Sequence, residues 1–183
     1  MNYYCIMVKT GAEESFKKEA LEKGSSFAVG LQFYFFKRKV INGGKQKGKI
    51  VESPMFPGYI FMGCADIDSY LIEQIRSCKN FYRFLSSDGK IRPLTGQDLD
   101  YLERLMRHGE VAGFSRVTFD ENDRIVILDG PLEGFKGNII KVDRRKRRVT
   151  IRLDMCGSIN KVDLCYEDVS KLSDPSASEE SES

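Results

Sequence analysis

The sequence predicts an α+β fold followed by a small β-barrel, and three observations support this prediction. In its first two thirds, β-prone apolar runs alternate with amphipathic segments that begin with helix-capping residues. Beyond about residue 123, short β-prone runs follow one another closely and no helical period appears. With 183 residues, 41% of them apolar and 31% charged, the chain is long enough for two small globular domains.

The first predicted elements are a strand, a helix and a second strand. Residues 3–9 are apolar and β-prone, which predicts the opening strand. Thr10 and Glu13 have the T-x-x-E spacing of a capping box, so we expect a helix to begin there. The helix should end near Gly24, because glycine readily adopts the left-handed conformation of a helix cap. Residues 33–40 predict the second strand.

A basic loop and an aromatic strand follow. Asn42-Gly43-Gly44 predicts a hairpin tip or loop. Residues 54–62, which read P-M-F-P-G-Y-I-F-M, predict a third strand with two prolines and a glycine at its head. The loop carries three cations that could face nucleic acid but are more simply read as solvated: Lys45, Lys47 and Lys49.

Two further helices and a short strand complete this part of the chain. Asp66 or Asp68 can cap the earlier helix, which should run to about residue 78. Thr95 and Asp98 repeat the capping-box spacing and predict a helix that ends at Gly109. Between these helices, residues 81–85 predict a short strand.

The remaining chain predicts a separate barrel. Closing several short strands into a barrel removes the exposed sheet edges that would otherwise invite aggregation. The predicted strands are residues 124–128, 137–142, 149–153 and 159–164. We therefore expect a first domain at 1–112, a linker at 113–123, the barrel at 124–172 and a disordered acidic tail at 173–183.

Composition excludes several classes of function. The five cysteines are scattered and form no C-x-x-C, which argues against a disulfide framework or a zinc site. His108 is the only histidine, so a histidine-based metal centre or catalytic relay is not expected. No apolar run approaches the about 20 residues that cross a bilayer. We expect a cytoplasmic protein that is not an enzyme and uses no cofactor.

Charge is concentrated in one short segment. Residues 144–148 are five consecutive cations, and Arg152 alternates with apolar residues on the strand that follows. Lys136 and Lys141 could widen this basic surface. Such a cluster fits phosphate groups, and arginine adds bidentate contacts and stacking on unpaired bases. The alternative is a hairpin tip whose charges are merely solvated.

Three motifs resemble the NusG family of transcription elongation factors. They are Y-Y-C-I-M-V-K-T-G at 3–11, the aromatic run at 54–62, and V-I-L-D-G-P-L-E-G-F-K-G-N-I-I-K-V-D at 126–143. The resemblance covers residues 3–172. It implies an N-terminal domain with an antiparallel sheet flanked by helices, followed by a KOW domain with an SH3-like barrel. The KOW turns would need three glycines, through positive φ or close backbone approach: Gly130, Gly134 and Gly137.

The resemblance also implies a partner for the aromatic run. In a strand, Tyr59 and Phe61 project to one face while Ile60 and Met62 project to the other. In the family, the equivalent aromatic face seats the clamp helices of RNA polymerase. Burial of all the aromatics in an ordinary core is the alternative. The residues that match the polymerase-binding positions are Met7, Phe56, Tyr59 and Phe61.

Departures from the common pattern point to a specialised member. General NusG proteins carry a phenylalanine before glycine in the last barrel hairpin, where they meet Rho or a ribosomal protein, whereas this chain has Cys156-Gly157. The basic segment is more similar to LoaP-like antiterminators, which recognise an RNA hairpin. In the RfaH type the first helix reads DNA, but here that helix offers Glu19, Glu22 and Lys23.

These features lead to one hypothesis and two alternatives. We expect a monomeric antitermination factor that binds RNA polymerase and leader RNA, with DNA near the polymerase as a further contact. The first alternative is a general adaptor that links RNA polymerase to Rho or the ribosome. The second is a KOW protein that binds RNA without contacting the polymerase.

Overall fold

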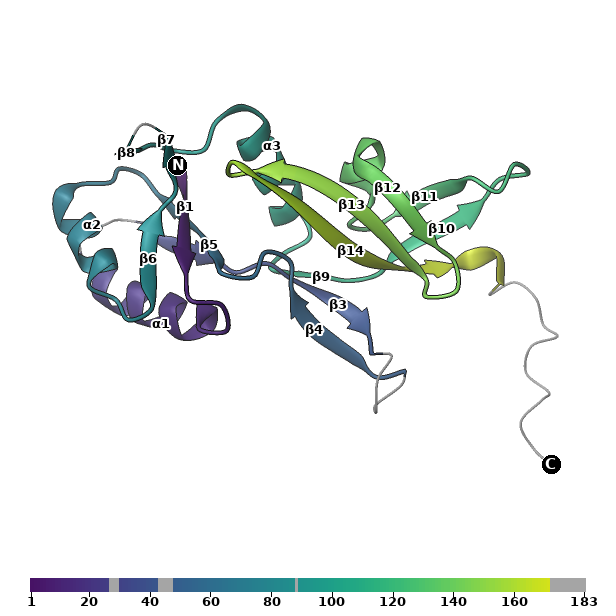
Figure 1. Cartoon of the computed structure of the whole chain (residues 1–183), viewed down its shortest axis with the longest axis horizontal. Coiled ribbons are helices and arrows are strands. Elements are labelled where there is room, and N and C mark those ends of the chain that lie inside the picture. The colour runs from purple at the N-terminus through teal and green to yellow at the C-terminus, as the bar shows by residue number, and fades with distance from the viewer. Residues whose placement is uncertain (27–29, 43–47, 88, 172–183) are drawn as a thin grey trace. The chain divides into compact units, whose positions relative to one another are not determined.

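The computed structural model describes residues 1–26, 30–42, 48–87 and 89–171, and it confirms the α+β class (Figure 1). The chain forms two compact units. The first contains Met1–Lys37, Pro54–Glu110 and Asp154–Asn160; the second contains Arg38–Ser53, Val111–Leu153 and the residues from Lys161 onward. Within the described ranges, no helix is both long and apolar enough to cross a membrane.

The first unit is built on a four-stranded sheet in the order β2-β5-β1-β6, and its described strand pairs are antiparallel. Two helices pack on one face of this sheet through an apolar core that includes Phe16, Leu71 and Ile75. This arrangement confirms the sheet flanked by helices. The elements are β1 (Asn2–Val8), α1 (Glu13–Gly24), β2 (Gln32–Tyr34), β5 (Tyr59–Cys64), α2 (Ser69–Arg76) and β6 (Phe81–Phe84).

Helix α1 lies where the sequence predicts it, but both of its ends differ in detail. Its N-cap is Ala12, which makes no side-chain capping bond, so the predicted capping box is wrong. Gly24 lies inside the helix and is buried, and its φ is not positive. A Cβ there would lie 2.6 Å from Leu31 Cδ2. Close packing, rather than a left-handed cap, therefore accounts for this glycine.

The second and third predicted strands are each interrupted. The second is divided into β2 and β3 (Lys37–Ile41), because Phe35 and Phe36 turn inward and are buried. The third is divided into β4 (Ile50–Pro54) and β5, with a turn between them. Strands β4 and β3 form a small sheet with β9 (Val111–Ala112). Of the loop cations, Lys49 is exposed, while Lys45 and Lys47 lie outside the described residues.

Two more helix caps were predicted, and one of them is present. Asp68 caps α2 as predicted, since its Oδ1 accepts the Leu71 N–H at 2.7 Å. Thr95 is the N-cap of α3 (Gly96–Met106) but makes no side-chain capping bond. Asp98 binds elsewhere, so this second capping box is also wrong. Two short strands, β7 (Ser86–Ser87) and β8 (Lys90–Ile91), pair between α2 and α3.

The second unit carries the predicted C-terminal strands as a five-stranded sheet in the order β11-β10-β14-β13-β12. Val149, Ile151 and Leu153 are buried and alternate with more exposed residues, as predicted. The elements are β10 (Ser115–Phe119), β11 (Ile125–Asp129), the 3-10 helix η1 (Glu133–Asn138), β12 (Ile139–Asp143), β13 (Arg148–Met155), β14 (Ser158–Asp168) and the 3-10 turn η2 (Val169–Lys171). The predicted tail at 173–183 lies outside the described residues.

Part of the predicted linker is strand β10. It lies within residues 113–123 and pairs with β11 on one side and, in parallel, with β14 on the other. Parallel pairing joins segments that are far apart in the sequence, so the local polarity of this stretch concealed it.

The three glycines of the predicted turns have different environments. Gly130 has φ +93°, and a Cβ there would lie 2.7 Å from Ser115 Cα. The neighbouring Ser115 is fully buried, and its Oγ accepts the Leu132 N–H at 2.9 Å. Gly134 and Gly137 lie in η1 without positive φ, and a Cβ at Gly137 would meet no atom within 4 Å. The predicted reason therefore holds for Gly130 and not for Gly137.

We expect Gly130→Ala to destabilise the protein by about 1–3 kcal/mol, because it combines left-handed strain with a clash against Ser115. Gly137→Ala is the matched control. It should be neutral or stabilise by up to about 1 kcal/mol, since alanine reduces the entropy of the unfolded chain. Urea unfolding followed by circular dichroism measures both values. Equal effects of the two substitutions would contradict this account of the turn.

Candidate functional site

The turn before β5 is held in place by a buried carboxylate. Glu13 is only 3% exposed. Its Oε1 accepts the Gly58 N–H at 2.8 Å, and its Oε2 accepts the Gly11 N–H at 2.7 Å. The Val8 N–H donates to the Gly58 carbonyl at 2.8 Å, and Gly58 has φ +83°. The F-P-G-Y turn is thereby fixed to the end of β1 and the start of α1.

Strand register places the candidate contact residues on the sheet face opposite the helices. Ile60 and Met62 belong to the helix-facing core, so Tyr59 and Phe61 project to the other side. Met7 lies opposite Tyr59 on β5 and opposite Arg83 on β6. Tyr59, Met7 and Arg83 therefore form a row across three strands.

Exposure divides the four predicted polymerase-binding residues into two pairs. Met7 and Tyr59 are half-buried, while Phe56 and Phe61 are 3% and 2% exposed. The Phe61 ring packs against Phe56 and Phe36, with centroids 5.9 and 5.7 Å apart. We expected all four to share an accessible face. The described structure instead buries Phe56 and Phe61, because this side of the sheet has an aromatic layer of its own.

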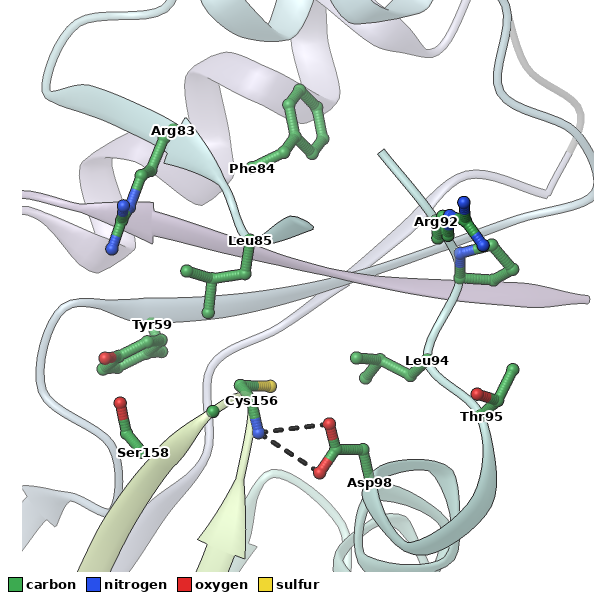
Figure 2. A pocket seen from close by; sticks show the side chains of 12 residues that line it. Tyr59, Arg83, Phe84, Leu85, Arg92, Leu94, Thr95, Asp98, Cys156 and Ser158 are labelled. Atoms are coloured by element: carbon green, nitrogen blue, oxygen red, sulfur yellow. Dashed lines mark hydrogen bonds between the residues drawn. The ribbon is translucent and has the colours of Figure 1, made fainter. Parts of the chain in front are cut away.

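A pocket of about 410 Å³ borders this row (Figure 2). Tyr59 and Arg83 line one part of it, and Asp98 and Cys156 line another. Its wall is mixed, with apolar, cationic and carboxylate groups. The complete lining is Tyr59, Arg83, Phe84, Leu85, Arg92, Pro93, Leu94, Thr95, Asp98, Cys156, Gly157 and Ser158.

Cys156 and Gly157 form the tight turn between β13 and β14, within the first unit. Both have positive φ, at 55° and 70°, as a two-residue hairpin turn of the primed type requires. Both Asp98 carboxylate oxygens accept the Cys156 N–H, each at 3.2 Å (Figure 2). Burial raises the pKa of the Cys5 thiol, and a hydrogen bond with Cys156 raises it further. Cys156 therefore contributes to packing here, and Asp98 orders its turn.

The five-cation segment is not uniformly exposed, which corrects the expectation of a single basic tip. Arg144 donates from Nη2 to Asp123, at 2.9 Å to Oδ1 and 3.1 Å to the carbonyl. Its guanidinium carbon lies 3.9 Å from the Phe119 ring centroid. Arg148 is half-buried and donates from Nη2 to the Ile41 carbonyl at 2.8 Å. Arg148 is thus a structural contact of the second unit.

The remaining three cations stand on a defined turn. Arg145, Lys146 and Arg147 are all exposed. The Arg147 carbonyl accepts the Tyr166 N–H at 3.0 Å, and Asp143 Oδ1 accepts the Lys146 N–H at 2.9 Å. These bonds fix the backbone of the turn, so its side chains project from a defined base.

The flanking cations lie in two places. Lys141 is opposite Thr150 in the β12–β13 pair, and Arg152 is two residues further along β13, so these two exposed cations share its outer face. Lys136 is exposed but borders a separate cavity of about 360 Å³, beside Val126 and Ile139. The structure therefore groups Lys141 and Arg152 with the turn, and Lys136 with an apolar cleft.

Sequence reasoning missed four residues that shape these surfaces. Glu13 carried a capping signal, but its distant partner Gly58 left no local trace. Arg83 could be recognised only from strand register. Phe119 and Asp123 lay in the predicted linker, where nothing in the sequence indicated an arginine partner. Among the described residues, no three His, Cys, Asp or Glu side chains gather closely enough to hold a metal ion.

Comparison with known proteins gives one consistent result. Residues 1–103 match the family described as "Transcription termination factor nusG". The "Transcription termination/antitermination protein NusG" of Helicobacter pylori strain J99 is 24% identical over 176 residues, covering 94% of this chain and 99% of that protein. The Bacillus subtilis protein of the same name is 25% identical, with coverage of 93% and 98%. The solved structure titled "Domain interaction in Thermotoga maritima NusG" shares the fold, with a TM-score of 0.55 at 23% identity over 90% of this chain and 93% of that one.

We expect Glu13→Ala to lower the free energy of unfolding by about 2–4 kcal/mol, because it leaves the buried Gly58 amide and the more exposed Gly11 amide without their carboxylate acceptor. Glu22→Ala is the control, since Glu22 is an exposed residue of the same helix. Urea unfolding of both variants provides the comparison. A loss at Glu13 no larger than that at Glu22 would show that the carboxylate does not hold the turn.

Proposed function

The chain belongs to the NusG family of transcription termination and antitermination factors, and on this premise we propose that it is an RNA-directed antitermination factor acting on RNA polymerase. The role is one of binding, not catalysis. We assign polymerase binding to the first unit and RNA binding to the second. The proposal rests on two surfaces, one in each unit.

The polymerase contact is assigned to the row formed by Tyr59, Met7 and Arg83. Tyr59 and Met7 are half-buried, so part of each side chain can be covered by a partner. Tyrosine offers a large apolar surface at a small loss of rotamer entropy, which is why it often dominates interface energies. Phe61, with the Phe56 ring packed on it, lies in the aromatic layer on the same side of the sheet and would help to keep this side rigid.

The effect on elongation would follow from differential affinity. A factor that bridges the polymerase cleft and binds the closed clamp more tightly than the open one shifts the clamp toward closure. The opened and paused state then becomes less populated. The clamp helices of RNA polymerase are the expected contact, as the family resemblance implies.

The RNA contact is carried by one observation: Arg145, Lys146 and Arg147 are exposed on a turn whose backbone is fixed by Tyr166 and Asp143. Lys141 and Arg152 extend this positive surface along β12 and β13. Phosphate neutralisation by such cations releases counterions and supplies affinity. A structured leader RNA is the proposed ligand, and its binding would recruit the factor to selected transcripts.

We expect replacing Arg145, Lys146 and Arg147 together by glutamine to weaken the binding of the full chain to a leader RNA hairpin. The plot of log affinity against log salt has a negative slope, and this slope should become less steep by about two units. Each phosphate contact contributes roughly 0.7–0.9 to its magnitude. Fluorescence anisotropy across a salt titration, with a scrambled RNA alongside, measures both quantities.

The matched control replaces three exposed cations of the first unit, Lys18, Arg76 and Lys90, by glutamine. It changes the net charge equally and should leave the salt slope unchanged. If both triple variants weaken binding alike, the effect is one of net charge and the turn is not the site. Capture of Rho or of a ribosomal protein, without selectivity for any RNA, would instead favour the general adaptor.

We expect Tyr59→Ala to weaken binding to the RNA polymerase core enzyme about 30-fold, corresponding to a loss of roughly 2 kcal/mol at a central aromatic contact. Tyr70→Ala is the control, because Tyr70 is 66% exposed on α2, which packs on the other face of the sheet. Circular dichroism should show both variants folded. Unchanged affinity in a folded Tyr59→Ala variant would remove the row from the interface.

A further inference from the structure

Arg144 has surroundings unlike those of the cations beside it. Its guanidinium carbon lies 3.9 Å from the Phe119 ring centroid, a separation at which the planar group stacks on the ring. Its Nη2 donates both to the carboxylate and to the carbonyl of Asp123. One face and one edge of the guanidinium are therefore already occupied by the protein.

The Arg144 side chain keeps substantial exposure to solvent despite these contacts. The side chain is 49% exposed, although Phe119 covers one face and Asp123 binds one edge. An exposed fraction of this size is what we expect of a planar guanidinium that is covered on only one face. Arg144 thus presents a planar cationic surface rather than a mobile charge.

This surface is held by several independent contacts. The Phe119 ring packs edge-on against the buried Tyr166, with centroids 6.0 Å apart. The Tyr166 N–H binds the carbonyl of Arg147, at the other end of the same turn. Ring, guanidinium and turn are therefore fixed to one strand, β14. Ordering such a surface before a ligand arrives lowers the entropy cost of binding.

We propose that the Arg144–Phe119 stack is a binding site for one unpaired nucleobase of the RNA, with Arg145 and Lys146 contacting the phosphates beside it. This inference rests on the RNA-binding role proposed above and makes it more specific. Every base has a π face that can stack on a guanidinium plane, but in a continuous helix both faces are already covered. A base in a bulge or loop has a face available.

The charge state of Arg144 favours a base over a phosphate. Its charge is already paired with the Asp123 carboxylate, and Nη2 is committed to two acceptors. A phosphate would have to compete with that carboxylate for the same group. A stacked base leaves the ion pair intact and uses only the open face. Arg145, by contrast, is exposed on the neighbouring position and suits a phosphate.

The test compares two RNA hairpins of the same sequence, one fully paired and one with a single-nucleotide bulge, binding to the full chain. The wild-type protein should prefer the bulged hairpin about tenfold, as expected for one base–side-chain stack. Arg144→Lys keeps the charge but loses the planar face, so it should reduce this preference to about one. Arg145→Lys is the control and should retain the preference.

Two further measurements separate stacking from a purely structural role of Arg144. Asp123→Asn removes the ion pair and leaves only neutral acceptors for Nη2, so the guanidinium is held less firmly while the surface becomes more positive. It should reduce the preference for the bulge without weakening binding to the paired hairpin. On binding the bulged hairpin, the Arg144 side-chain proton resonances should move upfield through the ring current of the stacked base. Urea unfolding confirms that each variant is folded.

The possible outcomes distinguish this inference from the function on which it rests. A preference for the bulge that survives Arg144→Lys, or equal salt-sensitive binding of both hairpins by the wild-type protein, overturns the stacking site and leaves RNA binding in place. Failure of the wild-type protein to bind either hairpin overturns both proposals. Loss of the preference in Arg144→Lys and Asp123→Asn, but not in Arg145→Lys, supports the site.

Discussion

The first unit depends on the Glu13 carboxylate, which binds two amides that are far apart in the sequence. By accepting the N–H groups of Gly11 and Gly58, it joins the start of α1 to the turn before β5. A buried carboxylate is costly unless its oxygens are satisfied, and charge-assisted bonds to backbone amides meet that requirement. Its position in the first turn of α1 adds a favourable interaction with the helix dipole. The direction in which Tyr59 leaves the turn follows from this contact.

For this unit, the alternation of side chains along the strands was predicted correctly from the sequence, whereas the hydrogen-bond partners of its carboxylates were not. Strand alternation correctly separated Ile60 and Met62 from Tyr59 and Phe61, because side-chain direction in a strand is local. Both capping boxes failed, because Glu13 binds the amides of Gly11 and Gly58, and Asp98 binds that of Cys156, rather than the amides of the predicted cap residues Thr10 and Thr95. Burial of Phe61 was likewise hidden, since the Phe36 ring that covers it comes from another segment.

The second unit shows the same division between local and distant information. Alternation along β13 was predicted from the sequence and is present, whereas β10 was overlooked because it pairs in parallel with β14, about 50 residues away. The five cations at 144–148 are alike in sequence but occupy three environments. Arg144 is paired and stacked, Arg148 is half-buried against a carbonyl, and the intervening residues are exposed. A charge run therefore indicates that cations are present, but not which of them remain available.

This division bears on how a small basic domain can select a transcript. Exposed cations such as Arg145 bind phosphates of any sequence, so they supply affinity and salt dependence but little discrimination. To select one RNA over another, the domain needs a group that is rigid and directional and whose contact with the RNA does not depend on overall charge. Arg144 meets these conditions, because Asp123 neutralises it and Phe119 fixes its plane. The same turn can thus combine general attraction to RNA with recognition of one exposed base. That recognition would distinguish a hairpin with a bulge or loop from an uninterrupted helix.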